Sequence, residues 1–254
     1  MEAPDAITLI IVGNELLTGK RQDRHLSHAI EILAARGLET RQCTLVGDHP
    51  RRLCRTLRNA MAARDIVFCF GGIGATPDDH TRQAAADAAQ MPLVVHEEAR
   101  ALIEARFGDD TYPHRIHMAE LPAGSTLIPN PVNQIPGFRI NDAHFLPGFP
   151  QMAYPMMEWV LDTYYPDMGG PRPIEHLVIV PEVTETDLMD TLQTLDRNHP
   201  EVDVSSLAHL GADGRRVEIG LRGQPGYVDA ARRELETLLD QHGRQWLIKE
   251  AVET

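Results

Sequence analysis

The chain has 254 residues and is poor in lysine and cysteine, and each shortage narrows what the protein can be. Its two lysines, Lys20 and Lys249, accompany a formal net charge of −13, which argues against a basic surface for nucleic acid or anionic membranes. The three cysteines are odd in number and lack metal-ligand spacing. That pattern indicates a reducing compartment rather than a disulfide framework or a zinc site.

Long apolar runs and a basic leader followed by an apolar core are also missing. A bilayer-spanning helix needs roughly 20 apolar residues, and no run approaches that length. The N-terminus does not match a secretory signal peptide. We therefore expect a cytoplasmic protein whose partners include neither membrane nor nucleic acid.

Apolar runs and helical periodicities alternate along the first two-thirds of the chain. Strands are expected at residues 6–12, 38–48 and 66–70, and helices at 25–37, 50–63 and from 76 to 90. This βαβαβα order predicts an α/β domain of three layers around a mostly parallel sheet. Farther on we expect a helix over 95–106, short strands at 125–128 and 144–146, and a helix ending near 163.

Proline and glycine concentrate in residues 165–173, which marks a domain boundary. We therefore divide the chain into a first domain, residues 1–165, and a second, residues 172–254. The second reads as a strand, an amphipathic helix, two strands joined by a turn at residues 212–214, and a helix ending before Gly243. This β-α-β-β-α order predicts a small α+β domain.

A glycine-rich turn follows the third strand and organises the predicted site. Gly71, Gly72 and Gly74 permit a positive φ and close approach of a ligand to the main chain. A strand that leads through such a turn into a helix presents free N–H groups, which favour phosphate. Asp78 and Asp79 follow, and two carboxylates beside a phosphate site are reasonable if a divalent cation lies between them. The sequence thus suggests a metal–phosphate site.

Helix capping is the alternative explanation for the same segment. Thr76 is a good N-cap, Pro77 suits the first helical position, and Asp79 follows the cap by three residues. Acidic residues also complement the dipole of a first helical turn. Capping does not explain three glycines, so local chemistry alone leaves both alternatives open.

Two further acidic residues follow strand ends. Glu15 comes after the first strand and Asp48 after the second. The carboxyl ends of parallel strands lie on one edge of a sheet, where open α/β folds bind ligands. We therefore expect Glu15, Asp48 and the glycine turn to line one pocket.

The ordered motifs resemble the molybdopterin-binding (MogA/MoaB-like) domain family, most closely its CinA-type branch. The turn Gly-x-Glu-Leu-Leu-x-Gly of that branch is similar to residues 13–19, and its signature GGLGPTxDDxT is similar to residues 71–81. Residues 46–48 are similar to the Val-Gly-Asp that ends the second strand in the branch, and residues 118–138 and 146–150 to its later segments. The resemblance covers roughly residues 5–165, and the second domain is similar to the small module that follows in CinA proteins. The C-terminal amidohydrolase domain of full-length CinA proteins has no counterpart in this sequence.

The resemblance implies a site and two functions. Phosphate would be bound by the turn around Gly71, and the wider ligand site would comprise Gly13, Asp48, Gly71, Gly72, Gly74, Thr76 and Thr81. Metal binding and water activation would fall to Asp78, Asp79 and Glu15. The cofactor would be Mg²⁺, Mn²⁺ or Co²⁺, and the ligand a small phosphate-bearing molecule such as molybdopterin or a nucleotide. The first function is hydrolysis of a nucleotide pyrophosphate such as ADP-ribose.

The second function is binding of molybdopterin or a nucleotide without turnover, related to molybdenum cofactor biosynthesis. A scaffold with a vestigial pocket is a third possibility. Relatives form dimers or trimers, so a homo-oligomer is expected.

The chain also departs from the branch pattern at several positions. Phe70 stands where the branch has threonine, Ala75 where it has proline, Arg24-His25 where it has Thr-Asn, and residues 132–135 where it has Gly-Thr-Ala. Arg24 and Lys20 could bind phosphate, although for Arg24 a solvated surface position is favoured. For His25 and His80 we favour exposed or capping positions over metal ligation. We expect no metal site at His114 and His117, since no third ligand has suitable spacing.

Overall fold

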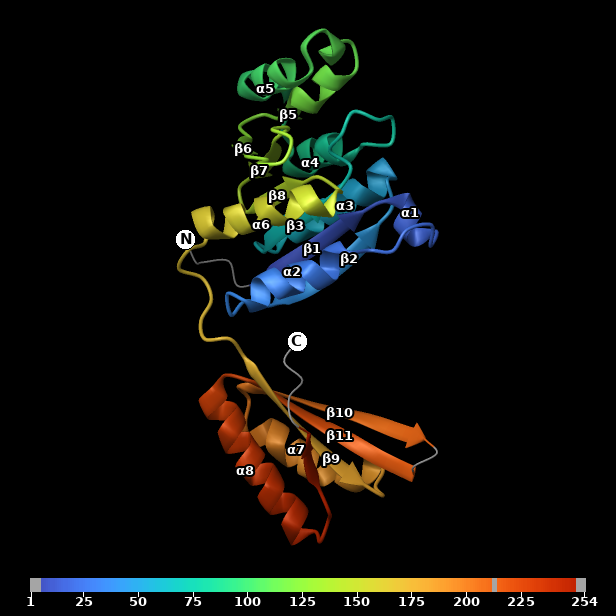
Figure 1. Ribbon diagram of the computed structural model, residues 1–254, viewed down its shortest axis with the longest axis vertical. Helices are drawn as coiled ribbons and strands as arrows, with labels where there is room; N and C mark the ends of the chain where they lie inside the picture. Colours follow the sequence, from blue (N-terminus) through green and yellow to red (C-terminus); the bar gives the residue numbers. More distant parts are fainter. Residues whose placement is uncertain (1–5, 212–213, 250–254) are drawn as a thin grey trace. The chain divides into compact units, whose positions relative to one another are not determined.

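The computed structural model describes residues 6–211 and 214–249 (Figure 1). Contacts between residues divide the chain into two compact units, Met1–Gly169 and Gly170–Thr254. Each unit has its own apolar core and is described by itself.

The first unit is built on a six-stranded sheet. Its strand order is β2 (Thr40–Val46), β1 (Ile7–Val12), β3 (Ile66–Phe70), β8 (Ala143–Leu146), β7 (Gly137–Ile140), β6 (Thr126–Ile128). Strands β2, β1, β3 and β8 pair in parallel, and β7 is antiparallel to both of its neighbours. The mostly parallel sheet predicted from the βαβαβα order is therefore confirmed.

Helices cover both faces of this sheet. One face contacts α2 (His25–Ala34) and α6 (Pro150–Tyr164). The other contacts α3 (Pro50–Ala62), α4 (Thr81–Ala89) and α5 (Glu97–Phe107). Successive residues of a strand face opposite sides, so both faces of β1 and β3 must be apolar, as their sequences predict. The three-layer α/β architecture is confirmed.

The segment between α4 and β8 holds elements that the sequence did not reveal. Strands β4 (Leu93–Val95) and β5 (Glu120–Pro122) form a separate antiparallel pair. Two 3-10 turns, η1 (Gly108–Thr111) and η2 (Arg115–Ala119), lie between α5 and β5. The helix expected from residue 95 begins instead at Glu97, because Val95 pairs with Glu120 and the His96 side chain accepts a hydrogen bond from the N–H of Ala99.

The second unit is an antiparallel sheet covered by two helices. The strand order is β10 (Val202–Gly211), β11 (Gly214–Gly223), β9 (Ile174–Pro181), β12 (Leu247–Lys249). Its core includes residues of η3 (Thr186–Leu188), α7 (Met189–Asn198) and α8 (Pro225–Gln241). The expected β-α-β-β-α order is confirmed, with β12 as an unpredicted edge strand, while two residues of the predicted turn, 212 and 213, lie outside the described residues. Within those residues, no helix combines the length and apolar character needed to cross a membrane.

Candidate functional site

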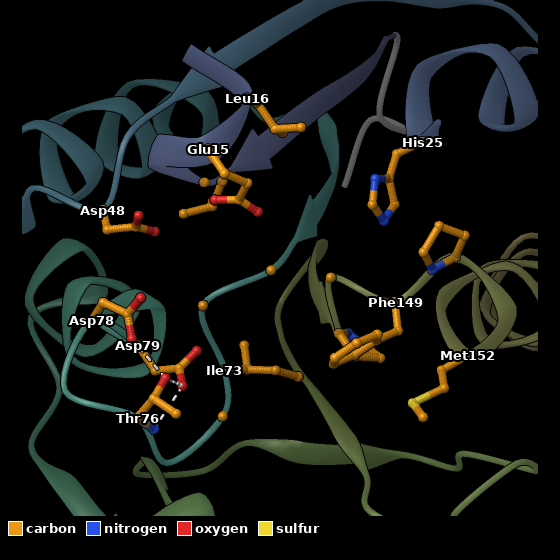
Figure 2. A pocket seen from close by; sticks show the side chains of 18 of the residues that line it. Glu15, Leu16, His25, Asp48, Ile73, Thr76, Asp78, Asp79, Phe149 and Met152 are labelled. Carbon is orange, nitrogen blue, oxygen red and sulfur yellow. Dashed lines mark hydrogen bonds between the residues drawn. The ribbon is translucent and has the colours of Figure 1, made fainter. Parts of the chain in front are cut away.

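A pocket of about 700 Å³ lies at the carboxyl edge of the six-stranded sheet (Figure 2). Segments that follow four different strands line it: residues 13–16 after β1, Asp48 after β2, residues 71–79 after β3 and residues 147–150 after β8. The parallel topology explains this convergence, since these four strands end at the same edge. Gly13, Glu15, Asp48 and the glycine turn, predicted to meet here, all line the pocket.

At Gly71 and Gly72 the backbone conformation itself favours glycine. Gly71 has φ +100° and Gly72 has φ +70°, conformations that side chains disfavour. A Cβ atom on Gly71 would lie 2.7 Å from the carbonyl oxygen of Val12, and one on Gly72 would lie 2.2 Å from Oγ1 of Thr81. Gly74 has no positive φ, but a Cβ there would lie 2.6 Å from Oδ2 of Asp79. The turn therefore fits tightly against β1, α4 and the acidic residues.

Part of this turn presents unused backbone donors. The Gly71 N–H donates to the carbonyl of Leu146, and the Thr76 N–H donates to Asp79. Between them, the N–H groups of residues 72–75 donate to no backbone carbonyl of the described part of the chain. Consecutive unused N–H groups in a turn form a concave anion site.

The helix after the turn begins later than predicted. Residues 76–79 form one isolated turn, in which the Asp79 N–H donates to the Thr76 carbonyl and the Asp79 carboxylate accepts from the Thr76 N–H. Helix α4 starts only at Thr81, with His80 as its N-cap residue. The expectation that Thr76 caps this helix and Pro77 opens it is therefore wrong. The Thr81 N–H is bonded to the Gly72 carbonyl, which fixes the first turn of α4 on the glycines instead.

Asp78 and Asp79 converge on one hydroxyl group. Oγ1 of Thr76 lies 2.6 Å from Oδ1 of Asp78 and also within hydrogen-bonding distance of Oδ2 of Asp79. A hydroxyl has one proton to donate, so two carboxylates compete for it. The hydrogen bond from Thr76 lowers the pKa of Asp78, which keeps that carboxylate charged. The Asp78 and Asp79 carboxylates therefore concentrate negative charge at this turn, and Figure 2 shows both beside Thr76.

Glu15 and Asp48 add two carboxylates from the other strands. Glu15 is half-buried in the pocket wall. Asp48 is tied to the start of α1 (Asn14–Leu17): its Oδ2 accepts the Asn14 N–H at 2.9 Å, and its own N–H donates to Oδ1 of Asn14 at 3.3 Å. Asp48 thus has a structural role beside its place in the pocket, whereas no hydrogen bond holds the Glu15 carboxylate within the described part of the chain.

Thr81 is placed behind the turn rather than in the pocket. Its side chain is fully buried, and its hydroxyl donates to the Gly71 carbonyl at 2.8 Å. It does not line the pocket. The resemblance includes Thr81 in the ligand site, but its buried position suits a residue that orients the first turn of α4 and not one that contacts phosphate.

Arg82 holds the same turn from the other side and was missed in the sequence. Its guanidinium group donates to the carbonyls of Gly74 at 2.9 Å and Glu120 at 3.1 Å, and also to that of His117. The residue is buried, with 7% of its surface exposed. These acceptors lie in segments far apart in sequence, so local patterns carry no signal for this role.

The structure agrees with some of the predicted locations of basic and histidine side chains and not with others. Arg24 lines the pocket and is exposed, whereas Lys20 is exposed and does not line it. His80 stands at the N-cap of α4 but makes no capping hydrogen bond. The expectation that His25 is exposed or capping is wrong: it is buried, because its ring lies 5.0 Å from that of Phe70, and it lines the pocket.

The substituted loop at residues 132–135 forms another pocket wall. The Asn130 side chain accepts the Val132 N–H at 3.0 Å, and the Asn133 side chain accepts the Ile135 N–H at 3.0 Å. Both asparagines and Ile135 line the pocket. The sequence predicted an altered loop here but gave no signal that Asn130 and Asn133 line the pocket.

The donor set fits a divalent cation only in part. Among the described residues, no group of three or more histidine, cysteine, aspartate or glutamate side chains is arranged to hold a metal ion. Asp78 and Asp79 supply two carboxylates. Mg²⁺ commonly binds through one or two carboxylates and completes its shell with water and substrate phosphate oxygens. Asp78 and Asp79 fit this mode, in which the phosphate ligand supplies part of the coordination shell. They do not fit a site in which protein side chains alone surround the ion.

Comparison with known proteins supplies relatives for both units. The family profile described as "Probable molybdopterin binding domain" matches residues 8–166. A protein of Pyrobaculum calidifontis is 30% identical over 247 residues, which cover 91% of this chain and 94% of that protein. A "CinA-like protein" of Geobacter metallireducens is 32% identical over 78% of this chain and 50% of its own length. The chain thus spans about half of that CinA-like relative.

A solved structure is also similar. The crystal structure described as "the protein CinA with unknown function from Thermoplasma acidophilum" matches with a TM-score of 0.58 and 28% identity. The match covers 63% of this chain and 97% of the other.

Proposed function

Because the chain belongs to the family of molybdopterin-binding domains and is CinA-like, we propose that it hydrolyses a nucleotide pyrophosphate such as ADP-ribose with a divalent cation. One observation carries the proposal. Unused N–H groups of a glycine turn lie beside Asp78 and Asp79 in a pocket that Glu15 also enters. The N–H groups suit phosphate, and the carboxylates suit a cation that binds together with it.

Binding would divide the pocket by charge. The N–H groups of residues 72–75 would donate to phosphate oxygens, and Arg24 at the pocket wall would add a cationic contact. A pyrophosphate brings further negative charge beside Asp78 and Asp79, which would repel it without a counter-charge. Asp78 and Asp79 would hold a divalent ion, which would offset that repulsion and supply a more acidic bound water.

The chain's own residues would then orient the reaction. Water adds its oxygen to one phosphorus atom while the bond from that phosphorus to the bridging oxygen breaks. The bridging oxygen leaves with the other phosphate, so ADP-ribose yields AMP and ribose 5-phosphate. The Glu15 side-chain carboxylate lines the pocket and would accept the proton of the attacking water.

Product release tests the proposal directly. Purified protein is incubated with ADP-ribose and Mg²⁺, Mn²⁺ or Co²⁺, and AMP is quantified by ion-exchange chromatography. We expect AMP release that falls by about 100-fold or more in Asp78→Asn and Asp79→Asn, the scale of loss when a group that stabilises transition-state charge is removed. Asp109→Asn, a change at an exposed aspartate outside the pocket, is the matched control and should keep full activity.

Two other outcomes separate the alternatives. Calorimetric binding of ADP-ribose without AMP release would refute hydrolysis and support a protein that binds its ligand without turnover. Absence of both binding and release with every cation would refute a nucleotide site altogether.

A further inference from the structure

Asn130 is a buried amide in the pocket wall that the proposed hydrolysis does not use. Only 5% of its surface is exposed, and it lines the pocket. It lies two residues beyond β6, which runs parallel to β8 because β7 is antiparallel to both. The chain therefore leaves β6 at the same carboxyl edge as the glycine turn, and β6 is a further strand that contributes to the site.

The backbone fixes which half of the Asn130 amide is left for a ligand. Its Oδ1 accepts the N–H groups of Val132 at 3.0 Å and Asn133 at 3.5 Å. Only the oxygen of an amide side chain can accept these bonds, so the NH₂ group is the half that remains. Both lone pairs of Oδ1 are used, and Asn130 therefore offers a ligand donors and no acceptor.

The NH₂ group has no partner in the described part of the chain. Nδ2 of Asn130 makes no hydrogen bond to another described residue. Nε2 of His25 is shut off from solvent as well as unpartnered, but Nδ2 of Asn130 is not such an atom, so part of its surface is accessible. Because the residue lines the pocket, a bound molecule can reach this donor. A polar side chain that is buried and held without a partner for one of its groups calls for an explanation.

Asn130 lies at the end of the pocket remote from the acidic residues. In the sheet, β6 is three strands from β3, a separation on the order of 14 Å at about 4.8 Å per strand. The neighbouring Asn133 supports this placement, because its Nδ2 lies 3.5 Å from Sδ of Met152. Figure 2 shows Met152 across the pocket from Asp78 and Asp79. With phosphate at the glycine turn, the ligand's heterocycle and not its second phosphate extends this far.

The burial and polarity of Asn130 favour an exocyclic oxygen of that heterocycle. Asn130 is recessed in the wall, so a group that projects from a ring reaches it more readily than a ring nitrogen does. A carbonyl oxygen projects by about 1.2 Å and can only accept. An exocyclic amine at the same place directs its N–H groups against those of Asn130 and leaves the buried donor unsatisfied.

We propose that Nδ2 of Asn130 donates a hydrogen bond to a carbonyl oxygen of the ligand's heterocycle, and so selects oxo rings over amino rings. This inference rests on the proposed function, because it assumes phosphate at the glycine turn. Within the proposed substrate class, the hypoxanthine counterpart of ADP-ribose is then bound more tightly than ADP-ribose itself. A 6-oxopurine and a pterin are the two sources of this chemistry. Asn130 is a specificity-determining residue and takes no part in bond cleavage.

Paired ligands that carry an oxo group or an amine at the same ring position test the proposal by calorimetry with Mg²⁺ present. IMP is compared with AMP, and 6-hydroxymethylpterin phosphate with its 2,4-diamino counterpart. We expect the oxo member of one pair to bind about tenfold more tightly, which is the scale of one buried donor left unsatisfied. The pair that shows the difference identifies the source of the heterocycle.

Asn130→Asp is the informative variant, because it keeps an oxygen to accept the Val132 N–H and replaces only the donor. The preference for the oxo ligand should disappear or reverse. Both members of a pair carry the same phosphate, so the effect of the added negative charge cancels in the ratio of their affinities. Asn59→Asp adds the same charge at an exposed position of α3 outside the pocket. It is the matched control and should keep the preference.

Side-chain amide spectra supply a readout independent of affinity. In ¹H–¹⁵N spectra, the pair of NH₂ signals lost in Asn130→Asp belongs to Asn130. We expect these signals to shift when the oxo ligand of the discriminating pair binds, because Nδ2 then gains an acceptor.

The outcomes distinguish this inference from the proposed function. Oxo ligands that bind no more tightly than their amino partners would refute the role of Asn130 and leave the phosphate site standing, as would a preference that persists in Asn130→Asp. NH₂ signals unchanged by ligand binding, as expected if only water contacts Nδ2, would also refute it. Failure of every probe to bind would overturn both the inference and the nucleotide site.

Discussion

Gly71→Ala should lower the free energy of unfolding of the first unit by more than the conformational cost of a side chain at positive φ, because the added Cβ also clashes with a neighbouring strand. Gly71 has φ +100°, and a Cβ there would lie 2.7 Å from the Val12 carbonyl oxygen, a backbone atom in the central strand β1. A side chain in a left-handed conformation costs about 1–2 kcal/mol. Forcing an extra carbon into a packed region costs about 1–3 kcal/mol more. We therefore expect a loss of about 2–5 kcal/mol in the free energy of unfolding.

Two other glycines separate these contributions. Gly19 has φ +70°, and a Cβ there would meet no atom within 4 Å, so Gly19→Ala isolates the conformational cost, about 1–2 kcal/mol. Gly226 lies in α8 with no positive φ and open space around its Cβ position. Gly226→Ala should be neutral or stabilise by up to about 1 kcal/mol.

Urea unfolding with fluorescence detection can measure the stability of the first compact unit separately. The chain has two tryptophans, Trp159 in α6 and Trp246 in the second unit. In a Trp246→Phe background, Trp159 reports on the first unit alone, and midpoints are converted to free energies by linear extrapolation. A loss in Gly71→Ala no larger than that in Gly19→Ala would show that β1 yields to the added carbon. The close approach of Gly71 to Val12 would then not be the reason for glycine at this position.

Two further predictions concern buried charged and titratable side chains. Arg82→Lys should lower the free energy of unfolding by about 1.5–3 kcal/mol and slow ADP-ribose cleavage several-fold. The reason is that an ammonium group cannot reproduce the guanidinium contacts to the carbonyls of Gly74 and Glu120. Urea unfolding and AMP release measure the two effects, and an unchanged unfolding midpoint would contradict this role of Arg82. Burial lowers the pKa of His144 to about 4 from its ordinary 6.5, so the folded protein binds fewer protons than the unfolded chain between these values. The free energy of unfolding should therefore fall by on the order of 3 kcal/mol as the pH drops from 6.5 to 4. Glutamine does not titrate, so His144→Gln should lose that part of the pH dependence. An identical pH profile in the variant would show that His144 is not the group responsible.

The sequence predicted the central strands well because their environment is simple. Strands β1 and β3 are buried on both faces, and a continuous apolar run is the direct consequence. Parallel order then followed from the alternation with helices, and with it the meeting of Glu15, Asp48 and the glycine turn at one edge.

Elements that depend on distant partners could not be predicted in this way. Strands β4, β5 and β12 have three residues each and exist through pairing with remote segments. In α2, Ile30 is 46% exposed, whereas Ile32 is buried. Which of two neighbouring isoleucines faces the sheet depends on the orientation of the helix, and that orientation is a tertiary property.

Two site residues, Arg82 and His25, also depend on contacts with distant segments. Arg82 acts through carbonyls of residues 74, 117 and 120, and His25 is buried by the ring of Phe70 on another strand. Neither contact produces a pattern in the sequence near Arg82 or His25 from which it could be predicted. The start of α4 was misplaced because Thr76 and Asp79 do form the hydrogen bond of a capping motif, but in a turn that the chain does not extend into a helix.

The contact between the two turns at the carboxyl edge bears on how the pocket accommodates a ligand. A Cβ on Gly148 would lie 3.2 Å from Cα of Gly71, whose N–H is bonded to the Leu146 carbonyl. The turn after β3 and the turn after β8 thus brace each other through main-chain atoms. A ligand that meets walls already fixed in this way loses little binding free energy to the ordering of loops. Substituting side chains around the pocket should accordingly change which molecule is selected while leaving the shape of the anion-binding turn intact.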